Sequence, residues 1–165
     1  MNNIAKVLMD NLRHEAKQAR VVLETAGGVE LDFVPSEGMR TLRELANHLA
    51  QIPKNDPMVY SAEIKDDEGI QEMEKKLWRD ELAEMTKVLD EGMDEAEARF
   101  VGMSDADFLD KKLKPFYEEG PAKNWAYYLP EMIAHIVMHK MQLWMYLKLA
   151  GANVDMHTYY GKYRE

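Results

Sequence analysis

Hydrophobic side chains recur every three or four residues along most of this chain, which is the period of an α-helix. Between Asn3 and Ala26 the apolar positions follow this spacing with charged residues between them, and Gly27 and Gly28 end the pattern. No stretch of four or more residues alternates between apolar and polar side chains as a half-buried strand would. The sequence therefore predicts an all-α protein.

A second helix is predicted from a capping motif. The stretch TLRE supplies a Thr-x-x-Glu capping box, in which the first and last side chains satisfy each other's free backbone N–H groups. The helix is expected from about Leu42 to Gln51. Pro53 and Pro57 are expected to end it, because proline lacks the N–H donor that a helix interior needs.

The third predicted helix begins near Ile70 and extends over some six turns, so we expect it to be the longest. Its apolar stripe consists of Trp78, Leu82, Met85, Leu89, Met93, Ala96 and Phe100. A short capped turn is expected at Ser104 to Asp107, followed by an irregular region.

The last predicted helix lies between Trp125 and Ala150, and Gly151 is its expected C-cap. Pro130 lies within this segment, so the helix is expected either to start near Leu129 or to kink at the proline. Four long helices in 165 residues predict one domain over residues 1–165, a four-helix bundle with a short C-terminal tail.

Composition excludes several classes of partner and chemistry. Acidic residues outnumber basic ones by 30 to 21, and the net charge of -9 disfavours nucleic acid and anionic membrane surfaces as partners. The chain has no cysteine, so any metal must bind nitrogen or oxygen and any thiol must come from outside. The charged residues within the most apolar segment disfavour a membrane span, and we expect a cytoplasmic protein.

Two histidines of the last helix are candidate metal ligands. His135 and His139 are four residues apart, so both imidazoles project from one helix face. Alone, this spacing is more often that of a core or surface histidine. However, Tyr128, Gln142 and Tyr146 extend the pair into a polar stripe on a largely apolar helix. Buried polar groups need partners, and a metal ion would supply one.

A third ligand is expected from the second helix. His48 lies beside the apolar stripe of that helix and can point into the bundle. His14 lies between Arg13 and Glu15 and His157 lies in the C-terminal tail, so both are predicted to be exposed. The candidate site is therefore His48, His135 and His139.

Further side chains are candidates to support this site. Gln142 and Asn47 could orient an imidazole, since a metal-bound histidine usually donates its second N–H to a neighbouring group. Tyr117, Tyr128 and Tyr146 are expected to line the mouth of the pocket.

Two segments resemble a known family. The stretch LRELANHL, which ends at Leu49, resembles the L-x-x-L-x-x-H-L helix of the DinB/YfiT-like family. The stretch HIVMHKMQL, which begins at His135, is similar to its H-x-x-x-H-R-G-Q-L signature. The departures are Lys140 for arginine and Met141 for glycine, and they put in doubt the close helix packing that a glycine permits.

The resemblance carries expectations about fold and function. It implies an up-down-down-up four-helix bundle, a homodimer, and a nickel or zinc ion held by His48, His135 and His139. Relatives with known activity use low-molecular-weight thiols, as S-transferases or as isomerases. It therefore implies a small-molecule substrate and a thiol cosubstrate.

Three functional hypotheses follow. The first is a metal-dependent thiol S-transferase, because three neutral imidazoles leave coordination positions open and ligation lowers the pKa of a bound thiol or water. The second is a metal-dependent hydrolase that uses the same three histidines with water as the nucleophile. The third is a non-catalytic, dimeric stress protein that a metal ion stabilises.

Overall fold

The computed structural model of the protein describes residues 3–162, so residues 1–2 and 163–165 of the expected single domain lie outside the described range. The described residues form helices and loops without a named strand, and one isolated antiparallel bridge joins Leu113 and Lys123. The helices are α1 (Asn3–Thr25), the 3-10 turn η1 (Ala26–Gly28), α2 (Leu42–Tyr60), α3 (Asp67–Leu77), α4 (Leu82–Val101), α5 (Asp105–Leu109), α6 (Trp125–Leu149) and α7 (Met156–Tyr159).

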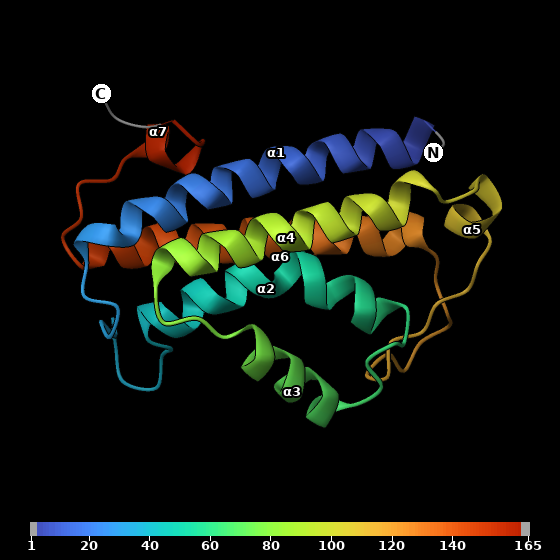
Figure 1. The fold of residues 1–165 in the computed structure, drawn as a ribbon, viewed down its shortest axis with the longest axis horizontal. Helices are drawn as coiled ribbons and strands as arrows, with labels where there is room; N and C mark the ends of the chain where they lie inside the picture. Colours follow the sequence, from blue (N-terminus) through green and yellow to red (C-terminus); the bar gives the residue numbers. More distant parts are fainter. Residues whose placement is uncertain (1–2, 163–165) are drawn as a thin grey trace.

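Four long helices form the bundle. Helix α1 packs on α4 and α6, and α2 packs on the same two helices from the other side. Figure 1 shows α1 and α6 running in one direction and α2 and α4 in the other. The predicted all-α bundle is confirmed, and its order of directions is up-down-down-up. Helix α2, which carries His48, thus lies against α6, which carries the other two candidate ligands.

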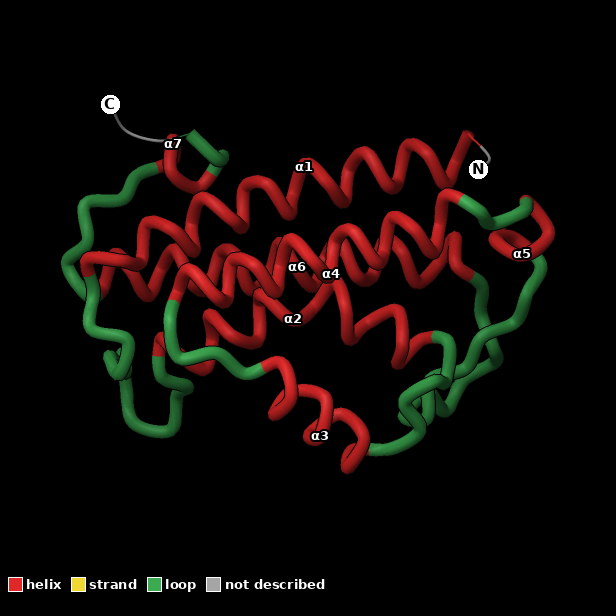
Figure 2. The backbone as a smooth tube through the Cα atoms, viewed as in Figure 1, coloured by secondary structure: helices red, strands yellow, loops and turns green. Residues whose placement is uncertain are grey.

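The short helices cover the ends and one side of the bundle (Figure 2). Helix α5 contacts α6, α7 contacts α1, and α3 lies along α2. The expected capped turn is α5, where the Ser104 side chain accepts a hydrogen bond from the Asp107 backbone N–H. His14 and His157 are exposed, as predicted.

The prediction that α2 ends at Gln51 was wrong. Helix α2 continues through Pro53 and Pro57 to Tyr60, and Figure 2 shows that it bends on the way. Each proline removes one backbone hydrogen bond, but burial of Pro53, Pro57 and Tyr60 favours continuation of the helix. Tertiary packing therefore outweighs local propensity here.

Helix α4 packs closely against α2 at a glycine. A Cβ atom at Gly92 would lie 3.2 Å from the backbone nitrogen of Lys54 and 3.3 Å from Cβ of Pro53. A Cβ atom would make these contacts tighter than most, so glycine at this position favours the close approach of α4 to the second half of α2.

The predicted longest helix is two helices. It breaks between Leu77 and Leu82, and α6, not this segment, is the longest helix. The reason lies on α2: the Asn47 side chain donates to the carbonyl of Arg79 and accepts from its N–H, both at 2.8 Å. Arg43 also donates to the Asp80 carbonyl at 2.6 Å. These contacts satisfy the backbone that a continuous helix would have paired internally.

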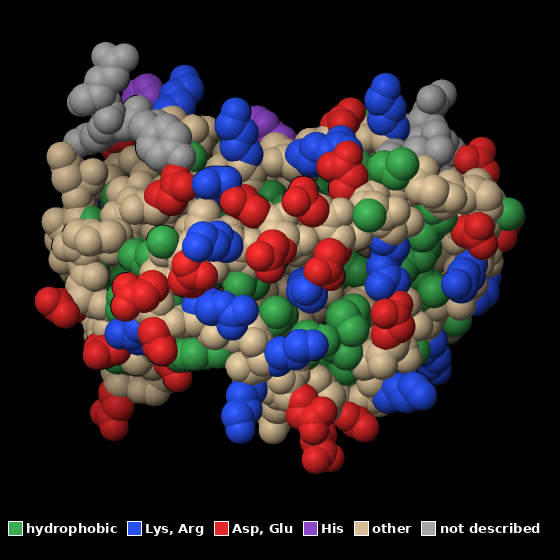
Figure 3. Space-filling model, in the orientation of Figure 1, with side chains coloured by type: hydrophobic (Ala, Val, Ile, Leu, Met, Phe, Trp, Pro, Cys, Tyr) green, Lys and Arg blue, Asp and Glu red, His purple; other side chains and the backbone are tan. Residues whose placement is uncertain are grey.

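Helix α6 begins at Trp125, where the Asn124 side chain caps it by accepting from the Tyr127 N–H. The alternative start near Leu129 was therefore wrong, and Pro130 lies inside the helix. Among the described helices, none is both long enough and apolar enough to cross a membrane. On the face shown in Figure 3, acidic and basic side chains are interspersed over the bundle.

Candidate metal centre

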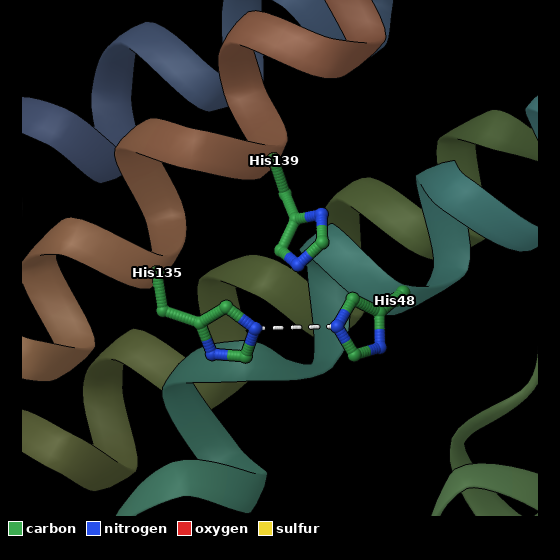
Figure 4. A group of neighbouring side chains, drawn as sticks. All are labelled: His48, His135 and His139. Carbon is green, nitrogen blue, oxygen red and sulfur yellow. Dashed lines mark hydrogen bonds between the residues drawn. The ribbon is translucent and has the colours of Figure 1, made fainter.

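The three predicted histidines meet between α2 and α6. Figure 4 shows His48 on one side and His135 and His139 on the other, with one nitrogen of each ring directed at a common point. The candidate ligand atoms all lie within 4.8 Å of one another, and the Nε2 atoms of His48 and His135 are 3.3 Å apart. His139 is buried and the other two rings are half-buried.

The Nδ1 atoms face away from this point, toward partners of their own. Nδ1 of His135 lies 2.9 Å from an Asp56 carboxylate oxygen, and Nδ1 of His139 lies 2.7 Å from Oε1 of Gln142. A Glu74 oxygen lies 3.6 Å from Nδ1 of His48. Carboxylate and amide oxygens accept hydrogen bonds, so His135 and His139 donate from Nδ1 and their Nε2 atoms carry lone pairs.

This arrangement fits a divalent cation. A neutral imidazole has one N–H, so His48 can donate to one of the two facing Nε2 atoms but not to both. A cation would accept a lone pair from each ring. Two nitrogen ligands on a tetrahedral ion lie about 3.3 to 3.4 Å apart, given metal–nitrogen distances of about 2.0 to 2.1 Å. The observed 3.3 Å between His48 and His135 matches this separation.

The local environment keeps two of these rings neutral. Burial, together with the neighbouring His139, Arg40 and His135, lowers the pKa of His48 to about 3. Burial, assisted by His135 and opposed by the hydrogen bond that His139 donates to Gln142, lowers the pKa of His139 to about 4. Neutral imidazole is the form that binds a metal, so both are ready to do so at neutral pH.

A row of side chains on α2 supports the site. His48, Ile52, Asp56 and Tyr60 follow one another at intervals of four residues along a face of the helix. Besides contacting His135, Asp56 accepts a hydrogen bond from the Tyr60 hydroxyl at 3.1 Å. Burial and the nearby Asp56 carboxylate raise the pKa of Tyr60, so its hydroxyl remains a donor.

Two cavities of about 200 Å³ each open beside His48 and Glu74, which line both. The first is mainly apolar and reaches His135; its other lining residues are Ile52, Asn55, Asp56, Val59, Tyr60, Ile70 and Tyr117. The second is polar, and its other lining residues are Arg40, Glu44, Asn47, Gln51 and Trp78. A metal ion at the three histidines would therefore be reachable from two sides.

Of the residues predicted to support the site, some contact a histidine or line a cavity as expected and others do not. Gln142 contacts His139, and Tyr117 lines the apolar cavity while remaining 55% exposed. Asn47 lines the polar cavity, but its hydrogen bonds go to the backbone of Arg43 and Arg79 and not to an imidazole.

Two tyrosines do not line either cavity. Tyr128 is buried, stacks on Tyr60 with ring centroids 4.7 Å apart, and directs its hydroxyl to Glu118. Tyr146 is also buried. Burial raises the pKa of the Tyr146 hydroxyl, and the nearby Arg40 acts in the opposite direction.

Sequence reasoning missed Asp56, Glu74 and Asn55. Asp56 and Asn55 lie beyond Pro53, where the helix was expected to have ended. Asp56 lies two four-residue steps after His48 on the same helix face, and this was a usable signal, had the helix been continued through the proline. Glu74 lies on α3, and the sequence carries no signal that places α3 against α2.

Comparisons with known proteins support the fold. The sequence matches no protein-family model and no curated protein. The structure is similar to a crystal structure from Exiguobacterium sibiricum 255-15, of a protein described as a candidate member of the DinB family. The TM-score is 0.75 at 21% sequence identity, and the similarity covers 96% of this chain and 99% of the other. The chain therefore has a DinB-like helical-bundle fold, with three histidines gathered between two of its helices.

Proposed function

We propose that the protein binds a divalent transition metal, nickel or zinc, through His48, His135 and His139, and uses it to transfer an external low-molecular-weight thiol to a small electrophile. The observation that carries the proposal is the convergence of three imidazole nitrogens at one point. Three protein ligands leave a coordination position open, as catalytic rather than structural sites do. When bound, the ion would act as a Lewis acid that lowers the pKa of a thiol or water.

The side chains around the histidines would hold this site in shape. Asp56, Gln142 and Glu74 each face an Nδ1 atom and so direct the corresponding Nε2 inward. Such contacts fix the tautomer and orientation of metal-bound imidazoles and increase their basicity. The half-buried setting also limits the access of bulk water to the reacting atoms.

Arg40 would position the thiol. It lines the polar cavity beside His48, and within the described part of the chain no hydrogen bond or ion pair engages its guanidinium. Guanidinium binds carboxylates through two parallel hydrogen bonds, and a small thiol such as cysteine carries a carboxylate. The chain has no cysteine, so a thiol nucleophile would have to be an external molecule of this kind. The cytoplasm, where thiols are kept reduced, would suit this chemistry.

In the proposed reaction the thiol loses its proton to solvent, and its sulfur lone pair forms a bond to an electrophilic carbon. The leaving group departs with the electron pair of the broken bond, so no oxidant or reductant is required. The apolar cavity beside His135 would hold the electrophile on the side opposite Arg40.

The test is a two-substrate assay on zinc- and nickel-loaded protein. Cysteine and an aryl halide should be consumed faster by the wild type than by His48→Ala, while His157→Ala, a change at an exposed histidine on α7, should match the wild type. Equal rates for wild type and His48→Ala, with metal bound to the wild type, would contradict the transferase. Ester hydrolysis without thiol consumption would instead support the hydrolase.

The role of Arg40 has its own test. Arg40→Gln should raise KM for cysteine by about tenfold or more, since a charge-assisted hydrogen bond contributes about 1.5 to 3 kcal/mol. KM for 2-mercaptoethanol, which has no carboxylate, should not change. An equal effect on both thiols would contradict a role in binding the carboxylate.

We further propose that the protein is a homodimer. Helix α6 presents a line of exposed apolar side chains, Met138, Met141, Met145 and Leu149, at helical spacing. Such a line is typical of an association surface. Light scattering on purified protein should give twice the mass of the chain, and Met141→Lys with Met145→Lys should shift it to monomer.

A further inference from the structure

One residue in the wall of the apolar cavity has a polar atom without a partner. Oδ1 of Asn55 is buried and makes no hydrogen bond within the described structure. An unsatisfied buried acceptor is destabilising, and such groups are rare in folded proteins. Asn55 also lines the cavity that reaches His135, so a donor bound there could supply the partner that Oδ1 lacks.

The other walls of the cavity define what fits beside Asn55. Ile52, Val59 and Ile70 supply aliphatic surface, and Tyr117 lies at the exposed edge. A cavity of about 150 Å³ can hold benzene, so one of about 200 Å³ suits a single ring or a short aliphatic chain.

The acidic residues that line this cavity disfavour an anionic ligand. Asp56 and Glu74 both line it, and the basic residue Arg40 lines the other cavity. Two carboxylates disfavour an anion and favour a hydrogen-bond donor. The two cavities beside His48 therefore differ in that only the polar one has a basic residue, Arg40, among its lining residues.

The geometry points to a substrate subsite: the cavity next to His135 binds a neutral group with an apolar body and one N–H or O–H donor, and Asn55 Oδ1 accepts from that donor. This assignment rests on the proposed function, because the bound group would be the electrophile of that reaction. Asn55 is a specificity residue here, since it selects a donor over an apolar group of equal size.

Two probes of matched size, benzyl alcohol and ethylbenzene, test the assignment by NMR titration of the zinc-loaded protein. Asn55→Leu keeps the side-chain size and removes the acceptor. The ratio of the two affinities should shift toward ethylbenzene by about fivefold in Asn55→Leu, the value of one ordinary hydrogen bond. Asn11→Leu, at an exposed position on α1, should leave the ratio unchanged.

Two further readouts separate a subsite from a structural role. Ile70→Phe, which fills the cavity from the half-buried α3 side, should weaken both probes by at least about fivefold. Asn55→Leu should unfold at a higher urea concentration than the wild type, because it removes an unsatisfied acceptor. Benzoate, an anion of similar size, should not bind the metal-free protein, in which the carboxylates of Asp56 and Glu74 act without a cation.

An unchanged probe ratio in Asn55→Leu, or full binding of the probes by Ile70→Phe, would overturn the assignment. Zinc content is measured on the same samples. If zinc is retained and the ratio does not shift, the subsite fails and the proposed metal function stands. If the wild type shows the expected ratio but binds no zinc or nickel, the proposed function fails and the subsite stands.

Discussion

Asp56 and His135 lie on facing helices, and the Asp56 carboxylate accepts a hydrogen bond from Nδ1 of His135 at 2.9 Å. Asp56 lies eight residues after His48 on α2. One helix therefore supplies both a candidate ligand and the group that orients the candidate ligand opposite it. This arrangement joins α2 and α6 through the site, in addition to their apolar packing.

Replacing the Asp56 carboxylate should weaken metal binding without abolishing it. Asp56→Asn keeps the size but removes the charge that favours the Nδ1–H tautomer of His135. Loss of such a partner lowers metal affinity by about 10- to 100-fold. Competition with a chromophoric zinc chelator measures this, and Asp94→Asn, on an exposed part of α4, is the matched control. Equal affinity for Asp56→Asn and wild type would contradict the orienting role.

Asn47 should prove to be a structural residue. Its side chain pairs with the backbone of Arg43 and Arg79 and is 2% exposed. Asn47→Ala would leave the backbone N–H and carbonyl of Arg79 unpaired and destabilise the protein by about 2 to 6 kcal/mol, at about 1 to 3 kcal/mol for each of these two groups. Urea denaturation measures the loss, with Asn11→Ala as the control. A loss as small as that of the control would show that the break before α4 does not depend on Asn47.

The stability of the metal-free protein should increase between pH 5 and pH 7.5. Burial lowers the pKa of His48 to about 3 and that of His139 to about 4, whereas both have an ordinary value of 6.5 when unfolded. Below pH 6.5 the unfolded chain therefore binds protons that the folded chain does not, and stability is lost as the pH falls toward the folded pKa values.

The size of this effect is measurable. At pH 5 the loss is about 2 kcal/mol for each of the two histidines. Denaturant titrations of chelator-treated protein at pH 5, 6 and 7.5 measure it. The double variant His48→Gln, His139→Gln should lose most of the pH dependence. A double variant with the pH dependence of the wild type would show that other groups cause it.

Lys140 should be essential to the core on the far side of α6. Its side chain is 1% exposed, and Nζ donates to Glu15 at 2.6 Å and to Gln18 while lying over the Tyr159 ring. Lys140→Met would leave the Glu15 carboxylate without its cation, and breaking a buried pair in this way costs about 3 to 5 kcal/mol. Adding Glu15→Gln should recover part of the loss, whereas purely additive losses would contradict the coupling.

The fold was predictable where the apolar period and the caps agree. The capping box of Thr41 and Glu44 correctly predicted where α2 begins, and Gly27 correctly indicated the end of α1. The break before Leu82 was not predictable, because a side chain from another helix, Asn47, causes it. Pro53 misled the prediction because local propensity carries no information about burial against α4.

In the candidate site, too, the local sequence pattern predicted some residues, and tertiary packing determines the others. The spacing of His135 and His139 placed both rings on one helix face, and the polar stripe around them indicated a shared partner. The apolar stripe of α2 indicated that His48 points inward. Gln142, three residues after His139 on one helix, was within reach of the same reasoning. The positions of Asp56 and Glu74 depend on how α2 bends and where α3 packs. Both are features of the tertiary structure that local sequence patterns do not predict.

The central claim is that three histidines form a divalent-metal site. Elemental analysis of the protein as isolated, followed by calorimetric titration of the metal-free protein with Zn²⁺ and Ni²⁺ at pH 7.5, tests it most directly. The account predicts about one bound ion per chain, lost in His48→Ala and retained in His157→Ala. A wild-type protein that contains less than about a tenth of an equivalent and fails to bind either added ion would contradict it.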